Sequence, residues 1–149
     1  MKIALGSDGK SNLTNVVEAE VKTYGHQVEL FGALKGDSAL WPNVAYEVAK
    51  KVATGEFDQA ILFCWTGTGI SMAANKVPGV RAALCHDAET AKGARLWNDA
   101  NVLAMSLRST SEEVAKEILK AWFSTSSSEK SDDKLCFKLL EKLDKQEGI

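Results

Sequence analysis

The feature that most constrains the fold of this sequence is a regular alternation between short apolar runs and amphipathic stretches. Each apolar run is five to seven residues long, which suits a buried strand. Each is followed by a stretch whose apolar residues recur every three or four positions, which is typical of a helix. Five such pairs predict a parallel sheet covered by helices on both faces, because parallel neighbours need crossover connections. Right-handed crossovers make such an α/β sheet doubly wound and Rossmann-like. The apolar runs occupy 2–6, 27–31, 59–64, 79–85 and 101–106, and the amphipathic stretches occupy 11–24, 43–53, 70–76, 88–97 and 111–123.

The last part of the chain departs from this alternation. Residues 124–133 are polar and predict a hinge, and residues 134–145 predict one more amphipathic helix. No strand pattern follows this helix, so it packs either on its own domain or on a partner subunit. We therefore expect one domain over 1–123, with a polar hinge and a C-terminal helix over 124–149.

The composition limits the classes of partner. The chain has 149 residues, 45% hydrophobic and 26% charged, which is typical of one soluble globular domain. Its net charge of −2 gives no indication of nucleic-acid or membrane binding. No apolar stretch approaches the roughly 18–20 residues that a membrane span needs. Three widely spaced cysteines predict neither a disulfide framework nor a zinc site. Since the N-terminus lacks a signal-peptide core, we expect a reduced, cytoplasmic protein.

A thiol lies where the third predicted strand meets a glycine turn, in the segment ILFCWTGTGISMAANK at 61–76. Ligands of open parallel sheets bind beyond the carboxyl ends of the strands, and Cys64 lies at that edge. Gly67 and Gly69 would let backbone N–H groups approach a ligand closely. A thiol beside the following helix N-terminus can have a lowered pKa and act as a base or nucleophile. The alternative is that Cys64 is a buried apolar residue that ends a strand.

Other polar residues lie at the ends of the predicted strands. Asp8 follows the first strand and His86 follows the fourth, so both belong to the same edge as Cys64. Asn98 and Asp99 precede the fifth strand, so the chain would have to bring them back to that edge. The glycine turn matches neither a P-loop nor the dinucleotide-binding fingerprint, so it does not indicate a nucleotide site.

Three segments of the chain form a distinctive combination. They are GSDG at 6–9, CWTGTGISMAANKVPGVRAALCHD at 64–87 and NDANVLAMSLR at 98–108. Together they resemble the family of type B ribose-5-phosphate isomerase and galactose-6-phosphate isomerase, in order from residue 1 to about residue 123. The resemblance implies an aldose–ketose isomerase of phosphorylated sugars that needs no metal or cofactor and works through a cis-enediolate. It also implies a homodimer or homotetramer whose active sites lie between subunits.

The resemblance implies roles for individual residues in the proton transfer. Cys64 matches the base that moves a proton between C1 and C2 of the sugar. Residues 65–70 match the loop whose backbone N–H groups hold the enediolate oxygens, which amounts to an oxyanion hole. Thr66 would supply a catalytic hydroxyl, and Asp8 and Asn98 would orient sugar hydroxyls.

The resemblance also implies a phosphate site. Arg108 matches an arginine that binds the phosphate, and Lys134 and Lys138 align with two arginines that reach it from the partner's C-terminal helix. These lysines have the four-residue spacing of one helix face, and the alternative is that they form an ordinary solvated surface. The expected substrate-binding residues are Asp8, Gly9, Trp41, Trp65, Gly67, Thr68, Gly69, Ile70, Ser71, Trp97, Asn98, Arg108, Lys134 and Lys138.

Four further positions depart from the family pattern, besides the two lysines that stand in place of arginines. Gly9 and Trp97 replace histidines, and the histidine at position 97 is the one credited with opening the furanose ring. Trp65 replaces a glycine beside the base, and Trp41 replaces a tyrosine of the pocket. Trp41 and Trp97 could instead be core residues.

These departures leave several functions open. The chain could be a ribose-5-phosphate isomerase, or it could isomerise an open-chain or four-carbon sugar phosphate. It could be the thiol-bearing subunit of a galactose-6-phosphate isomerase, which requires a second homologous subunit. A sugar-phosphate-binding protein without activity is the remaining alternative, although a binder has no need of a base.

Overall fold

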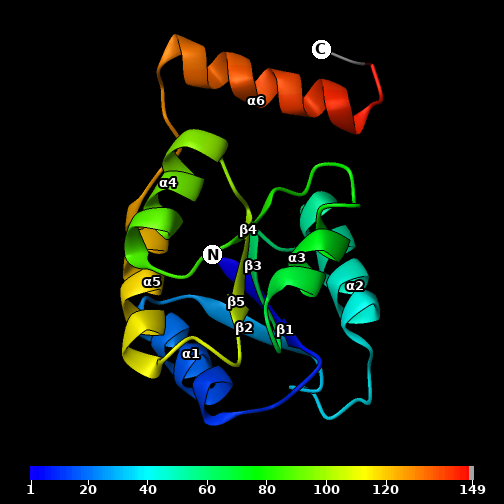
Figure 1. Ribbon diagram of the computed structural model, residues 1–149, viewed down its shortest axis with the longest axis vertical. Helices are drawn as coiled ribbons and strands as arrows, with labels where there is room; N and C mark the ends of the chain where they lie inside the picture. Colours follow the sequence, from blue (N-terminus) through cyan, green and yellow to red (C-terminus); the bar gives the residue numbers. More distant parts are fainter. Residues whose placement is uncertain (148–149) are drawn as a thin grey trace.

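The computed structural model describes residues 1–147, and its elements are labelled in Figure 1. In chain order they are β1 Lys2–Ser7, α1 Asn12–Thr23, β2 Gln27–Gly32, α2 Trp41–Ala53, β3 Gln59–Cys64, α3 Thr68–Ala74, β4 Ala82–Leu84, α4 Ala88–Asn98, β5 Val102–Ser106, α5 Glu112–Ser124 and α6 Ser131–Asp144. The strands form one five-stranded sheet in the order β2-β1-β3-β5-β4, and every neighbouring pair is parallel. The predicted doubly wound sheet is therefore confirmed.

Helices cover both faces of the sheet, because side chains alternate between the two faces along each strand. On β1, Ile3 and Leu5 pack in one core cluster with α1, α4 and α5, whereas Ala4 packs in the other with α2 and α3. Figure 1 shows α1, α4 and α5 on one side of the strands and α2 and α3 on the opposite side. Helices therefore cover both faces of the sheet.

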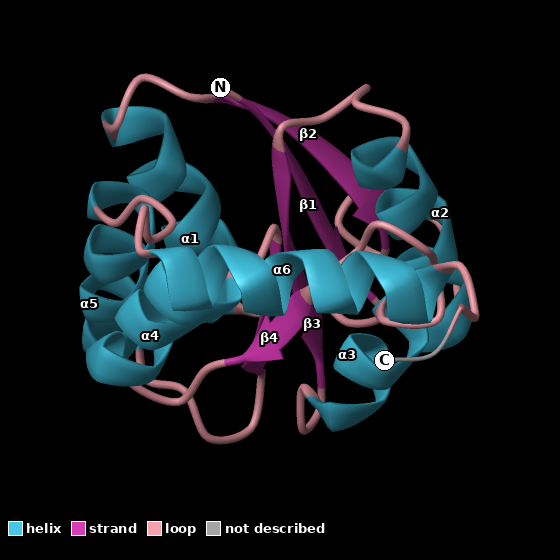
Figure 2. Cartoon of the chain, turned by 90° about the horizontal axis from the view of Figure 1, so that it is seen from above, coloured by secondary structure: helices cyan, strands magenta, loops and turns pink. Residues whose placement is uncertain are grey.

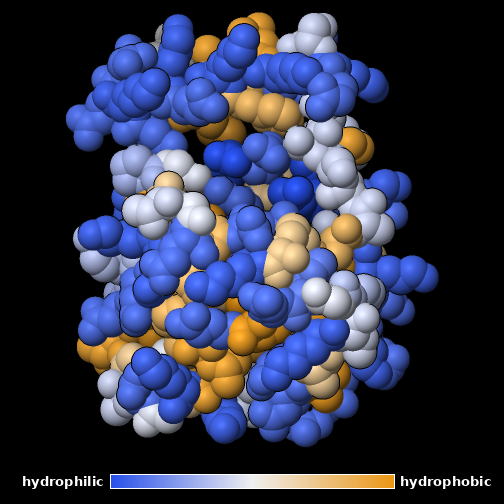
Figure 3. Space-filling view, turned by 180° about the vertical axis from the view of Figure 1, so that it is seen from behind, coloured by the Kyte–Doolittle hydropathy of each residue, from blue (hydrophilic) through white to orange (hydrophobic). Residues whose placement is uncertain are grey.

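Helix α6 lies across one end of this body, as Figure 2 shows from above. It follows a segment in which the Ser128 N–H donates to the Leu96 carbonyl at 2.8 Å. At its other end the Asp144 carboxylate accepts a hydrogen bond of 2.7 Å from the N–H of Gly79, which precedes β4. No residue of α6 is buried, and Figure 3 shows a hollow between this helix and the hydrophilic residues below it. Helix α6 therefore lies at the end of the sheet where β4 and β5 begin.

The fourth strand is shorter than the predicted 79–85. Strand β4 begins at Ala82, and the Arg81 N–H is bound by the Asn101 side chain at 2.8 Å instead of by a strand. Gly79 has a φ of +85°, which belongs to a turn. The segment before β4 is consequently a tight loop.

Three helices begin earlier than predicted, and one of them is α3, which begins at Thr68 instead of residue 70. Helix α2 begins at Trp41 because Pro42 suits a first helical turn. Helix α6 begins at Ser131, with Asp132 and Asp133 in its first turn, where negative charge is favourable. The polar hinge is shorter as a result, and residues 148–149 of the predicted C-terminal segment lie outside the described residues. Within residues 1–147 no helix is both long and apolar enough to cross a bilayer.

Candidate active site

Cys64 is the last residue of β3, at the end of the sheet where β1 and β5 also finish. This edge lies at the topological switch point, because the chain leaves β1 for β2 on one side and later places β3 on the other. The side chain is 5% exposed and packs in the α2/α3 core cluster, and its carbonyl accepts the Leu107 N–H at 3.0 Å. Cys64 therefore belongs to the core and also ends at the edge where ligands bind.

The turn after Cys64 presents backbone N–H groups at the same edge. Gly67 has a φ of +76° and starts α3, whose first N–H groups have no carbonyl partner within the helix. The hydroxyls of Thr66 and Thr68 are 2.7 Å apart, and both residues are exposed. Ile70 and Ser71 are buried and anchor the helix. The turn thus offers N–H and O–H donors to a ligand, as the sequence predicted for an oxyanion site.

Two tryptophans border this turn. Trp41 is 40% exposed, and its indole lies against Gly69, where a Cβ atom would be 3.3 Å from the ring. Trp65 directly follows Cys64 and is 64% exposed. The interpretation of Trp41 as a core residue is therefore wrong, because it lies half open beside the turn.

The turns after β1 and β5 bring further predicted residues to this edge. Burial raises the pKa of the Asp8 carboxyl, and its own backbone amide partly offsets the increase. The Gly9 N–H donates to the Ser7 hydroxyl at 3.1 Å, and a Cβ atom at Gly9 would lie 3.3 Å from the Leu107 side chain. Arg108 is exposed after β5, and its N–H donates to the Trp65 carbonyl at 3.0 Å.

Trp97 and Asn98 lie at the other end of the sheet. They end α4, just before β5 begins, and both are exposed, so the core interpretation of Trp97 is wrong as well. The register aligns Cys64 with the last residue of β5, whereas Ala60 aligns with the first, Val102. Four strand residues span about 13 Å, so one copy of the chain does not bring Asn98 to Cys64.

An ion pair fixes the turn that follows Asn98. Asp99 has a φ of +47°, in the left-handed region that ends α4. The Arg81 guanidinium donates to the Asp99 carbonyl at 2.7 Å and to its carboxylate at 2.9 Å. The sequence analysis did not identify Arg81, although a lone arginine within the predicted apolar run at 79–85 was a possible signal.

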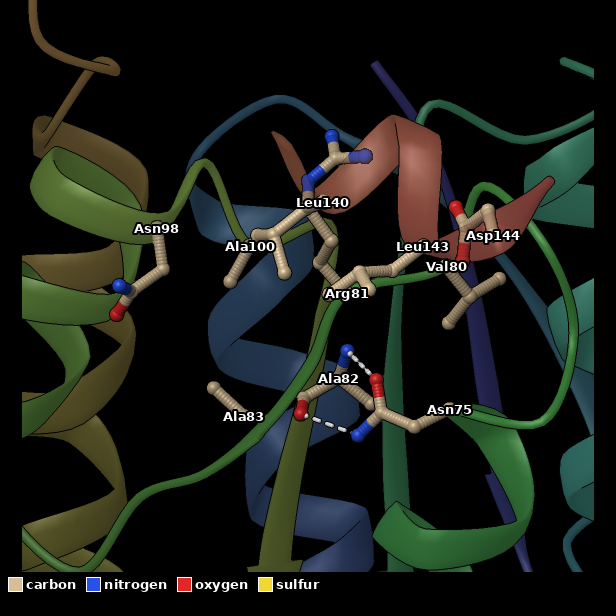
Figure 4. A pocket seen from close by; sticks show the side chains of 10 residues that line it. All are labelled: Asn75, Val80, Arg81, Ala82, Ala83, Asn98, Ala100, Leu140, Leu143 and Asp144. Atoms are coloured by element: carbon tan, nitrogen blue, oxygen red, sulfur yellow. Dashed lines mark hydrogen bonds between the residues drawn. The ribbon is translucent and has the colours of Figure 1, made fainter. Parts of the chain in front are cut away.

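Asn98 opens on a cavity of about 390 Å³ between α6 and the starts of β4 and β5. Figure 4 shows the Arg81 side chain extending up to the level of α6, beside Leu140, and the Asn75 side chain bound to the backbone of Ala82 on the opposite side. Both Asn75 hydrogen bonds are 2.8 Å long. The cavity thus has polar groups on both sides, with Asp144 on α6 facing Asn75, Arg81 and Asn98, and apolar side chains lie between them.

The two predicted phosphate-binding lysines are exposed on α6. Lys138 lies two residues before Leu140, so it points to nearly the opposite side from the cavity. Lys134 forms an ion pair with Glu129 in the hinge. Both lysines are therefore open to solvent, and Lys138 lies on the face of α6 away from the cavity.

The structure thus divides the predicted residues into two groups, which we call the thiol edge and the helix-end group. The thiol edge contains Asp8, Gly9, Trp41, Cys64, Trp65, Thr66, Gly67, Thr68, Gly69, Ile70, Ser71 and Arg108. The helix-end group contains Trp97, Asn98, Lys134 and Lys138.

The chain has two further cysteines, Cys85 and Cys136, and a histidine after β4, His86. Burial and the charge of Asp87 raise the pKa of the Cys85 thiol to about 12, so Cys85 stays protonated at neutral pH. His86 is exposed after β4, and Cys136 is exposed on α6. No cluster of metal-ligating side chains occurs among residues 1–147.

The chain is similar in sequence to known sugar-phosphate isomerases. The sequence profile of the family described as Ribose/Galactose Isomerase matches residues 3–138. Ribose-5-phosphate isomerase B of Escherichia coli is 41% identical over 122 residues, which cover 81% of this chain and 82% of that protein. D-erythrulose-4-phosphate isomerase of Pectobacterium atrosepticum is 38% identical over 124 residues, with 82% of each chain covered.

A solved structure shares the whole architecture. Ribose-5-phosphate isomerase B of Clostridium thermocellum superposes with a TM-score of 0.90 at 34% identity, covering 99% of this chain and 100% of that one. The similarity extends through α6, so the C-terminal helix belongs to the shared fold.

Proposed function

This chain belongs to the ribose/galactose isomerase family and is an aldose–ketose isomerase of sugar phosphates, and we propose that its preferred substrate is a short, open-chain sugar phosphate with Cys64 as the base. The observation that carries the proposal is the thiol at the open end of β3, beside a turn of unpaired N–H donors. A resemblance in three segments led to this family, and the family profile spans all three.

The proposed chemistry is a proton transfer between neighbouring carbons. The Cys64 thiolate removes the C2 proton of the aldose, the C–H electron pair forms a C1–C2 double bond, and the carbonyl electrons move to O1. The backbone N–H groups of residues 65–70 stabilise the charge on the enediolate oxygens. The thiol then returns the proton to C1, and the O2 proton moves to O1 with the help of the Thr66 hydroxyl. The product is the ketose, with no net change in protons or electrons.

A second copy of the chain is proposed to complete each site. The thiol edge carries the base and Arg108, whereas Asn98 lies at the opposite end of the same sheet. Lys134 and Lys138 are exposed on α6, and Lys138 lies on the face away from the cavity. In the proposed homodimer, Asn98 of one subunit orients sugar hydroxyls at the thiol edge of the other, and the lysines share the phosphate with Arg108.

The proposed preference for a short substrate follows from the residues at three positions. Opening a sugar ring needs a group that can both donate and accept a proton, but the Trp97 indole only donates and Gly9 has no side chain. Erythrose 4-phosphate has no free hydroxyl with which to close a furanose, so it needs no such group. Trp65 adds bulk beside the base. The relative that acts on D-erythrulose 4-phosphate supports the same preference.

We expect the kcat/KM of the wild-type chain to be at least about tenfold higher for erythrose 4-phosphate than for ribose 5-phosphate. A difference of this size lies within the range by which a binding pocket discriminates between substrates. Replacing Trp97 with histidine should raise kcat/KM for ribose 5-phosphate, because it restores a ring-opening group. The reaction of each sugar is followed by NMR with the purified chain alone.

The matched control is Trp97→Phe, which removes bulk without adding an acid–base group. Only the histidine variant should gain activity on the cyclic sugar. Equal wild-type rates on both sugars, with no gain in Trp97→His, would contradict the open-chain preference. Ribose 5-phosphate would then be as good a substrate as the short sugar, in line with the name of the Escherichia coli relative.

Shared sites predict that two inactive variants restore each other. Cys64→Ala and Asn98→Ala change opposite ends of the sheet, so a mixed dimer has one site with both changes and one site with neither. Random mixing makes about half of the dimers mixed, and each has one intact site of two, so about a quarter of wild-type activity should return.

The control is a mixture of Cys64→Ala with Arg108→Ala, which both change the thiol edge. No mixed dimer of this pair has an intact site, so activity should not return. Recovery in the control, or its absence in the first mixture after subunit exchange is verified by native mass spectrometry, would contradict a site shared in this way.

A further inference from the structure

The Ser106 hydroxyl forms hydrogen bonds with two loops of the thiol edge. Ser106 ends β5, is 1% exposed, and is the register partner of Cys64 on the neighbouring strand. Its Oγ donates to the Trp65 carbonyl at 2.9 Å. The same Oγ accepts the N–H groups of Arg108 at 3.2 Å and Ser109 at 3.1 Å. One donor and two acceptor positions are all that a serine hydroxyl offers, so none is left for a ligand.

These contacts connect the residue after the thiol to the turn that carries Arg108. Two direct hydrogen bonds run in parallel, from the Leu107 N–H to the Cys64 carbonyl and from the Arg108 N–H to the Trp65 carbonyl, each 3.0 Å long. Among the hydrogen bonds described here, only the one to the Ser106 hydroxyl binds the N–H of Ser109, the residue after Arg108. The Ser106 hydroxyl therefore fixes the curvature of the turn as well as its attachment.

We propose that Ser106 is a positioning residue that holds the Arg108 turn at a fixed distance from Cys64, so that the bound anion and the reacting carbon are aligned. The inference rests on the proposed function, since it takes Arg108 as a phosphate ligand. It assigns a role to a side chain that touches no substrate, and the sequence analysis did not identify it. A polar residue closing an otherwise apolar strand was the available signal.

The expected consequence of losing the hydroxyl follows from these partners. In Ser106→Ala the Ser109 N–H loses its acceptor, whereas the Arg108 N–H keeps the Trp65 carbonyl. The turn stays attached at Arg108, and the Thr110 N–H still donates to the Ser106 carbonyl at 3.3 Å, but Ser109 between them loses its restraint. Arg108 then samples more orientations, and binding must select the productive one.

The test measures binding of erythrose 4-phosphate by calorimetry in the Cys64→Ala background, where turnover is minimal. Adding Ser106→Ala should raise Kd about tenfold, equivalent to about 1.4 kcal/mol. Ser106→Thr keeps the hydroxyl and should remain within about threefold of the background. Ser109→Ala is the matched control, since its exposed hydroxyl makes no hydrogen bond among those described, and its Kd should not change.

A double-mutant cycle separates positioning from general destabilisation. If Ser106 acts through Arg108, adding Ser106→Ala to Arg108→Ala should change Kd by less than about twofold. A full tenfold loss in that background, or an unchanged Kd in Ser106→Ala, would overturn the inference. Thermal unfolding of each variant establishes that the titrated protein is folded.

Failure of the proposed function has a separate signature. Binding without turnover in the wild-type chain rejects the isomerase chemistry, while the Kd series still decides the role of Ser106. A wild-type chain that binds neither erythrose 4-phosphate nor ribose 5-phosphate would overturn both.

Discussion

Cys64→Ala is expected to lower kcat by roughly 10²–10⁴-fold, the range that a positioned acid–base group contributes. The thiol ends β3 beside the donor turn, where we propose that it acts as the base, and alanine fills most of its space without a proton-accepting atom. Substrate affinity should change much less, because the N–H donors and Arg108 remain. Turnover is measured with erythrose 4-phosphate, and Kd is measured separately by calorimetry.

The chain contains a matched control for this substitution. Cys136→Ala removes the same group from an exposed position on α6 and should leave kcat unchanged. Cys85 is a poorer control, because it is fully buried in the other core cluster and its replacement would disturb packing. Cys64→Ser should remain as inactive as Cys64→Ala, since an unperturbed hydroxyl is a far weaker acid than a thiol.

Solvent exchange gives a second measure of the same step. In D₂O the wild-type enzyme should introduce deuterium at C1 or C2 of the sugar, and Cys64→Ala should not. Near-normal turnover of Cys64→Ala would mean that another group is the base. Tight binding with no exchange even in the wild type would instead support the binding-protein alternative.

The sequence predicted the order and type of the main elements because the alternation of apolar runs and amphipathic stretches is imposed by burial on two faces. It predicted element ends less well. Helix α2 begins at Trp41 because Pro42 suits the first turn, and β4 begins only at Ala82 because the Asn101 side chain binds the preceding N–H. Competition of this kind for a single N–H group leaves no periodic pattern in the sequence, so the start of β4 could not be predicted from it.

The thiol edge was predictable because every parallel strand ends at the same side of the sheet, so Asp8 and Cys64 had to be neighbours. The location of Asn98 at the other end was equally predictable from its place before β5. The Ser106 contacts were not, because they depend on the curvature of a turn. The paired role of Arg81 and Asp99 was missed for the same reason, since eighteen residues separate them in the chain.

Gly67→Ala is expected to have the second large effect, on both stability and activity. Gly67 has a φ of +76°, which costs a residue with a side chain about 1–2 kcal/mol. A Cβ atom there would also lie 2.6 Å from the Leu84 side chain and 2.9 Å from the Met105 backbone carbon. Met105 lies in the middle of the sheet and cannot move away, so overpacking adds about 1–3 kcal/mol. The free energy of unfolding should fall by about 2–5 kcal/mol in urea titrations.

Activity should fall further than stability requires, because the clash is relieved by moving the turn away from β5. That turn carries the N–H donors, and a displacement of about 1 Å in a catalytic group can cost about 10²-fold in rate. Gly55→Ala is the matched control, since Gly55 also has a φ of +76° but nothing lies within 4 Å of its Cβ position. It should lose only the conformational part, about 1–2 kcal/mol, and keep full kcat/KM. The difference between the two variants isolates the close approach of Gly67 to β5. If Gly67→Ala matched Gly55→Ala in both stability and turnover, the turn could not be the rigid oxyanion site proposed here.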